Sequence, residues 1–144
     1  MGFLDGMDIS ASGLTAQRLR MDVISDNIAN IDTTRTESGD PYKRKYVVLQ
    51  ERPNNFSDIL GSSLLSKTAG GVVVSEIGED ASQGELVYDP SNPDANQDGY
   101  VEMPNVDITQ EMVDMISAYR SYEANVTSFN AYKEMAVKTL EIGK

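Results

Sequence analysis

The sequence contains no cysteine, no histidine and no tryptophan. Without cysteine there is no disulfide, thiolate metal site or thiol nucleophile, and without histidine there is no imidazole ligand or imidazole base. A pair of carboxylates or a serine–lysine pair is still compatible with this composition, but no such pair stands out along the chain. We therefore expect a protein that is not an enzyme and that has no catalytic, cofactor-binding or metal-binding residues.

Basic residues and long apolar runs are also scarce. Lys and Arg number 12 against 23 Asp and Glu, so the formal net charge is −11, which disfavours nucleic acid and anionic lipid as partners. The one basic cluster, residues 43–45, is short and typical of a solvated strand end. No stretch is long and apolar enough to span a membrane, and the first residues lack the basic and apolar regions of a cleaved signal. These rules alone place the chain in the cytosol.

Both ends of the chain have the pattern of long helices. The five prolines all lie between Pro41 and Pro104, so none interrupts residues 1–33 or 107–144. In each end segment, apolar residues recur in two series with a spacing of seven, which predicts amphipathic helices and a coiled-coil stripe. Asp107 is expected to cap the second helix, with Gln110 returning the bond, and Gly143 stands near its end.

The middle segment, residues 34–106, has a different pattern. Short β-prone runs occupy residues 46–49, 71–74, 85–88 and, more weakly, 100–103, with Ser, Asn, Asp and Gly between them. We predict a mainly α protein with a small β region, in which a loop-rich β-hairpin segment separates the two helices. The longest loops are expected at residues 33–41 and 54–67, and both are expected to be mobile.

The first predicted helix has a half-polar stripe, so a pair of such helices would be marginally stable alone. About a dozen buried side chains at roughly 2 kcal/mol each contribute less than the ordering of about 60 residues costs. We expect other chains to bury the remaining apolar positions, so that the ends fold on assembly. The alternative is an ordinary monomer in which both helices pack on the β region.

Several segments resemble the signatures of flagellar rod and hook proteins. The N-terminal signature is matched by DISASGLTAQ at residues 8–17 and NIANIDT at 27–33, and the C-terminal one by MVDMI at 112–116 and RSYEAN at 120–125. The runs YDPSNPDAN at 88–96 and DGYVEMPNV at 98–106 are similar to FlgC-type proximal rod proteins in particular. The short middle segment agrees with this likeness, because hook and distal-rod relatives have longer ones.

The resemblance implies a function that composition does not reveal. Proteins of this family leave the cell unfolded through the flagellar type III export apparatus, without signal cleavage. They polymerise in the periplasm into a helical tube, and their partners are other copies, other rod proteins and the base of the basal body. The family pairs its N- and C-terminal helices as an antiparallel coiled coil in the inner layer of the tube. On this basis the expected location is the periplasmic rod rather than the cytosol.

The expected functional residues are those of an assembly surface. The predicted assembly stripe consists of the apolar residues of the heptad series: Met7, Leu14, Met21, Ile24, Ile28, Ile31, Met112, Met115, Tyr119, Tyr122, Val126, Phe129, Ala136 and Leu140. Asn27, Asn30 and Thr33 share one helical face. Their side chains are expected to bond backbone groups where the first helix ends.

One motif suggests a different class of protein. Residues 94–99 match the first half of an EF-hand calcium loop, but Asn105 stands where a bidentate Glu is needed, and Pro90 and Pro93 exclude an entering helix. A tight turn between two strands is the favoured interpretation. The alternatives to a rod subunit are a calcium-binding regulatory module built on residues 94–105 and a cytosolic coiled-coil adaptor.

Overall fold

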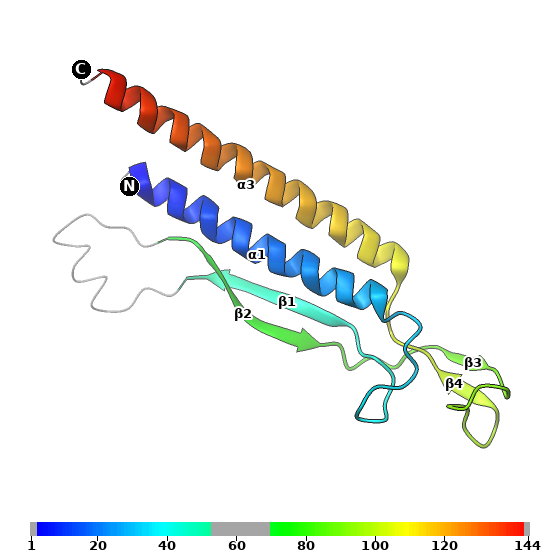
Figure 1. Ribbon diagram of the computed structural model, residues 1–144. Coiled ribbons are helices and arrows are strands. Elements are labelled where there is room, and N and C mark those ends of the chain that lie inside the picture. The colour runs from blue at the N-terminus through cyan, green and yellow to red at the C-terminus, as the bar shows by residue number, and fades with distance from the viewer. Residues whose placement is uncertain (1–2, 53–69, 143–144) are drawn as a thin grey trace.

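Two long helices lie side by side, and a β-ribbon lies along one of them (Figure 1). The computed structural model describes residues 3–52 and 70–142. Helix α1 spans Phe3–Ala29 and helix α3 spans Ile108–Ile142. The predicted fold class is confirmed: the protein is mainly helical with a small β region. In the described part of the chain, neither helix is long and apolar enough to cross a membrane.

Helix α3 begins as the sequence predicts, with one difference. The Asp107 carboxylate accepts hydrogen bonds from the backbone nitrogens of Thr109, at 2.8 Å, and Gln110, at 3.4 Å. These bonds satisfy amide groups that have no partner within the helix. The Gln110 side chain was expected to return a bond to Asp107, and this was wrong. Its amide donates to Asp114 at 3.3 Å instead, because an acceptor one turn further along is within reach. Gly143, the expected helix end, lies outside the described residues.

The two helices run antiparallel, and residues seven apart on α1 meet residues seven apart on α3. A Cβ atom added at Gly6 would lie 2.6 Å from the Tyr132 ring, and one added at Gly13 would lie 3.0 Å from the Asn125 amide. At the other end, Asn27 bonds Glu111. The absence of side chains at the two glycines therefore lets the helix backbones approach closely.

This close approach predicts the effect of a larger residue at position 13. Gly13→Leu should push the helices apart and cost about 1–3 kcal/mol, the usual effect of overpacking. Gly13→Leu combined with Asn125→Ala should recover part of the loss, whereas Thr15→Leu on the exposed side of α1 should have little effect. Hydrogen exchange of the α1 amides in the three variants measures this. Equal protection in Gly13→Leu and the unmodified chain would contradict the packing.

An antiparallel pair of strands covers α1 on the side away from α3 (Figure 1). Strands β1, Lys45–Glu51, and β2, Val72–Glu79, pair from Lys45 opposite Glu79 to Glu51 opposite Val72, with a bulge after Val48. The Ser12 hydroxyl accepts a hydrogen bond from the Val72 backbone nitrogen at 3.0 Å and so joins α1 to the start of β2. Helix α1 is thus the middle layer of three.

A second, shorter hairpin extends beyond the ends of the helices (Figure 1). Strand β3, Leu86–Tyr88, pairs with β4, Tyr100–Glu102. All four predicted β-prone runs therefore fall on strands. The segment between α1 and β1 folds back on itself through backbone bonds from Tyr42 to Thr33 and from Thr36 to Asp40. The second predicted loop, residues 54–67, lies outside the described residues.

Candidate functional site

Helix α3 presents an apolar stripe that is left exposed by residues 3–52 and 70–142, the part of the chain that the structure describes. Five apolar side chains near its start are between 44% and 61% exposed. Four of them are spaced three or four residues apart and the fifth is adjacent to one of these, which places them on one side of the helix. We call them the outer stripe: Ile108, Met112, Val113, Ile116 and Tyr119. Continuous apolar surface of this kind marks interaction sites in soluble proteins.

The residues of the predicted assembly stripe fall into three groups. On α3, Met112, Tyr119 and Leu140 are 55%, 57% and 75% exposed. A second group on α3 is half-buried and lies beside the positions that contact α1. It consists of Met115, Tyr122, Val126, Phe129 and Ala136. The α1 members are partly covered: Ile24 is buried, and Met7, Leu14, Met21, Ile28 and Ile31 are half-buried. A single chain thus covers only part of the set.

The predicted helix-end residues bond backbone and one another. Asn30 donates from its side chain to the backbone oxygen of Asp26 at 2.9 Å, and the Thr33 hydroxyl donates to the Asn30 side-chain oxygen at 3.2 Å. Asn27 is different, because it is fully buried and reaches across the molecule. Its amide nitrogen donates to the backbone oxygen of Lys45 at 2.8 Å and to Glu111 at 3.0 Å.

The Asn27 side-chain oxygen is equally occupied. It accepts from the Lys45 backbone nitrogen at 2.9 Å and from the Tyr42 hydroxyl at 3.0 Å. An Asn side chain has two donor hydrogens and an oxygen with two lone pairs, so every hydrogen-bonding capacity of Asn27 is used. A fully satisfied buried amide is a strong positional constraint, because any displacement leaves several polar groups unpaired.

Glu111 is also fully buried, and Arg44 balances its charge. The Arg44 Nε donates to the Glu111 carboxylate at 2.6 Å, and its Nη2 donates to Asp114 at 3.4 Å. Arg20 on α1 donates to the other oxygen of Asp114 at 3.3 Å. Two guanidinium groups and two carboxylates therefore link α1, the start of β1 and α3. Position 111 lies in the first turn of α3, where the helix dipole also favours a carboxylate.

The network extends to the segment before α3 through Asn105. Its side-chain oxygen accepts from the Arg44 backbone nitrogen at 2.7 Å, and its amide donates to the backbone oxygens of Asp80 and Ser82, both at 3.1 Å. We call Asn27, Tyr42, Arg44 and Glu111 the polar node.

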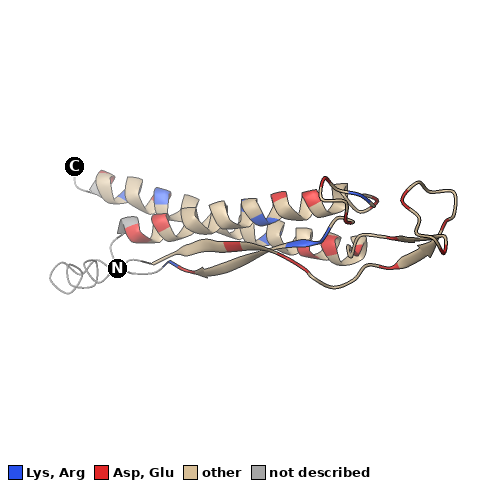
Figure 2. Cartoon of the chain, turned by 90° about the horizontal axis from the view of Figure 1, so that it is seen from below, with Lys and Arg blue, Asp and Glu red and all other residues tan. Residues whose placement is uncertain are grey.

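Elsewhere the charges are dispersed, with acidic residues along both helices and at the β3–β4 end (Figure 2).

Sequence reasoning found Asn27 but missed its partners. Tyr42, Arg44, Asn105 and Glu111 lie 15 to 84 residues from the groups they bond. No local spacing rule connects residues so far apart in sequence. Residues 43–45 were interpreted as a solvated basic strand end. For Arg44 this was wrong, because its guanidinium turns inward to a buried carboxylate.

Tyr42 gives the polar node a pH dependence. Burial raises the pKa of the Tyr42 phenol above its ordinary value, and the carboxylates of Asp26, Glu111 and Glu79 raise it further. The folded state therefore favours the neutral phenol, and stability should fall as the pH rises from about 10 through the raised value.

Replacing Tyr42 tests this directly. Tyr42→Phe should cost about 1 kcal/mol at neutral pH, because one hydrogen bond to Asn27 is lost. It should also flatten the decline of stability above pH 10. Urea unfolding between pH 7 and 11 checks both effects, with Tyr119→Phe on the outer stripe as the control. An identical alkaline decline in all three proteins would rule out this role of Tyr42.

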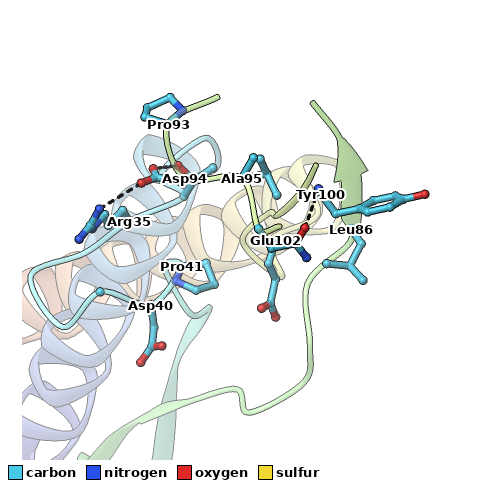
Figure 3. A pocket seen from close by; sticks show the side chains of 13 residues that line it. Arg35, Asp40, Pro41, Leu86, Pro93, Asp94, Ala95, Tyr100 and Glu102 are labelled. Atoms are coloured by element: carbon cyan, nitrogen blue, oxygen red, sulfur yellow. Dashed lines mark hydrogen bonds and ion pairs between the residues drawn. The ribbon is translucent and has the colours of Figure 1, made fainter. Parts of the chain in front are cut away.

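The calcium-like segment forms a turn, as the favoured interpretation held. The Asn96 side-chain oxygen accepts from the backbone nitrogens of Asp98 and Tyr100, and Gly99 has a positive φ of 81°. Asp94 accepts from the Thr34 hydroxyl at 2.9 Å and from Arg35 at 3.4 Å. Its carboxylate is thus engaged by the loop after α1 (Figure 3).

An open hollow of about 420 Å³ lies between that loop and the β3–β4 hairpin. Figure 3 shows Asp94 turned toward Arg35. The carboxylates of Asp40 and Glu102 point away from Asp94. Among the described residues, no three acidic side chains converge as a metal site would require. Nothing here supports the calcium-binding alternative.

Comparison with known proteins identifies the family. A model described as "Flagella basal body rod protein" matches residues 7–35, and one described as "Flagellar basal body rod FlgEFG protein C-terminal" matches residues 97–142. The flagellar basal-body rod protein FlgC of Bacillus subtilis strain 168 is 58% identical over 96% of both chains. The chain belongs to the FlgC family of flagellar basal-body rod proteins. The FlgC of Borreliella burgdorferi is 45% identical over 99% of this chain and 98% of its own, and that of Escherichia coli O6:H1 is 42% identical over the whole of both.

Membership of the FlgC family confirms the resemblance drawn from the two signatures. The family models cover helix α1 with the loop after it, and the β4 strand with helix α3. These are the parts of the chain that contain the outer stripe, Asn27 and Glu111. The function is therefore that of a structural rod subunit, and its partners are other components of the rod.

Proposed function

We propose that this chain is built into the flagellar rod through the outer stripe of α3, and that it performs no chemistry. The observation that carries the proposal is the exposure of Met112, Ile116 and Tyr119, each more than half exposed in the single chain. Burying one such side chain against a neighbour contributes about 1.5–3 kcal/mol. Repeating the contact from subunit to subunit generates a helical assembly when the interface is head-to-tail.

The layering of the fold explains why α3 would face the neighbours. Helix α1 is covered by α3 on one side and by the β1–β2 ribbon on the other, whereas α3 contacts only α1 among the described elements. Between residues 119 and 141 of α3 no side chain is buried. That half of the helix is the part most dependent on other chains for stability, as proposed for helices that fold on assembly.

Location and export are further parts of the proposal. The chain would leave the cell unfolded through the flagellar export apparatus and assemble in the periplasm, next to the base of the basal body. The second half of α3 supports this proposal, since residues 119–141 have no buried side chain and a helical segment of this kind unfolds at little cost. The prediction of three segments, residues 1–33, 34–106 and 107–144, stays a proposal for how the chain divides between the inner helical layer and its surroundings.

Hydrogen exchange can test the dependence of α3 on assembly. In the purified chain, amides of residues 119–141 should exchange much faster than those of residues 20–29, which lie beside the polar node. In detergent-extracted basal bodies both regions should be protected. Strong protection of residues 119–141 in the purified chain would contradict the proposal, and so would absence of the chain from the basal bodies.

A further inference from the structure

We infer that the polar node sets the register of α1 against α3, and that it does so only when residues 42–45 are in place. The inference goes beyond the proposed function, since it concerns how the subunit itself is built. Asn27 on α1 and Glu111 on α3 bond each other at 3.0 Å, but each also requires the segment between the helices: Asn27 bonds Lys45 and Tyr42, and Glu111 bonds Arg44.

Apart from the ion pair between Arg20 and Asp114 at 3.3 Å, the remaining contacts between the helices discriminate poorly between registers. They involve small or half-buried residues such as Gly6, Gly13 and Ala118, and both helices repeat with a spacing of seven. A shift of one heptad would again place a glycine of α1 opposite a residue of the same α3 face. Such repeats pair about equally well in several registers unless a buried polar group singles one out.

At the polar node a shift is costly. In the observed register, Asn27 uses all four of its hydrogen-bonding capacities and the buried Glu111 charge is neutralised by Arg44. Moving α3 by seven residues in either direction separates Glu111 from both Asn27 and Arg44. The shift brings Glu111 opposite Arg20 in one direction and beyond the last residue of α1 in the other. The Asn27 amide and the Arg44 guanidinium then lose their acceptor on α3, which is destabilising, so the shifted states are depleted. A single buried Asn has this effect in coiled coils.

The segment 42–45 makes the pairing conditional. Arg44 is the cation that permits Glu111 to be buried, and its backbone nitrogen is bonded by Asn105, immediately before α3. The helices can therefore adopt the native register only after the chain between them has folded back against α1. Native pairing of α1 with α3 therefore requires that residues 42–45 already occupy their native positions.

Engineered cysteines can measure the register, because the sequence has none of its own. Gly13→Cys with Asn125→Cys reports the native register, since a Cβ at position 13 falls 3.0 Å from the Asn125 side chain. Gly13→Cys with Ala118→Cys, or with Tyr132→Cys, reports a shift of one heptad in either direction. The purified full-length chain is equilibrated in a glutathione redox buffer, in which the disulfide fraction of each cysteine pair measures how often its two thiols meet. Mass spectrometry of the monomer fraction excludes crosslinks between copies.

With the node intact, the disulfide equilibrium constant of the native pair should exceed that of either shifted pair about a hundredfold, as expected when a shift leaves the Asn27 amide and the Arg44 guanidinium without their acceptor. In Arg44→Met combined with Glu111→Leu, which replaces the ion pair by apolar side chains, the excess should fall to about tenfold or less, with helix content kept. Circular dichroism checks the helix content.

Three results would overturn the inference. An unchanged excess in the apolar variant would show that the glycine contacts set the register. Loss of all crosslinks in that variant would show that the node is needed for pairing itself rather than for its register. Failure of the native pair to form with the node intact would contradict the observed geometry. None of these results bears on rod assembly through the outer stripe, so the proposed function is tested separately.

Discussion

Arg44→Met is expected to unfold the region where the two helices meet. It removes the only guanidinium within hydrogen-bonding distance of Glu111 among the described residues, while Glu111 stays fully buried at 0% exposure. Breaking a buried ion pair in this way costs about 3–5 kcal/mol, which is comparable with the whole stability of a small domain. Amides of residues 108–118 should lose more than about a hundredfold of their hydrogen-exchange protection.

A second substitution distinguishes loss of charge balance from loss of packing. Arg44→Met combined with Glu111→Gln removes the unpaired charge but keeps a side chain that can bond Asn27, so most of the protection should return. Lys43→Met, on an exposed neighbour of Arg44, is the matched control and should have little effect. If Arg44→Met behaved like Lys43→Met, Glu111 would not depend on Arg44.

Ile116→Asp is expected to abolish swimming without unfolding the chain. Ile116 is 61% exposed, so the substitution should change the stability of the single chain by no more than about 0.5 kcal/mol. In an assembled rod, however, the carboxylate would be buried against a neighbouring subunit without a partner, at a cost of several kcal/mol. Cells that lack the native copy and carry the variant should not spread in soft agar, and their extracted basal bodies should lack the chain.

The control lies one residue further along the helix. Ser117→Asp adds the same charge at an exposed, already polar position that lies about 100° around the helix from Ile116, so swimming should be largely retained. Met115→Asp and Ile28→Asp, which charge half-buried positions of the predicted assembly stripe, should also block incorporation, but with loss of the folded chain as well. Normal swimming of Ile116→Asp would exclude the outer stripe as an assembly contact.

The helices and strands could be predicted because their signals are local. The heptad spacing and the absence of proline predicted α1 and α3, and the β-branched runs predicted the positions of β1 and β2. A helix or strand places its own residues on defined faces, so the pattern within a segment is sufficient. The Asp107 cap was found for the same reason, since it acts within four residues.

The choice of contact face could not be predicted in the same way. The apolar series containing Met112 and Tyr119 was part of the predicted stripe, yet in the single chain these residues are exposed, while the face that includes Glu111, Ala118 and Asn125 meets α1. Glycine at positions 6 and 13 allows a closer contact than larger apolar side chains would, and the polar node supplies the bonds. A pattern of apolar residues shows which surface avoids water, but not which molecule covers it.

The sequence by itself determined the secondary structure, the family and the exclusion of histidine- and cysteine-based chemistry, because each depends on residue identity and short-range spacing. Only the tertiary structure decided that Asn27, Tyr42, Arg44 and Glu111 form one buried network. Those residues come from three segments, and their bonds exist only where the chain folds back and brings them within about 3 Å of one another. Long-range placement of polar groups is decided by the packing of the whole chain, which no single segment encodes.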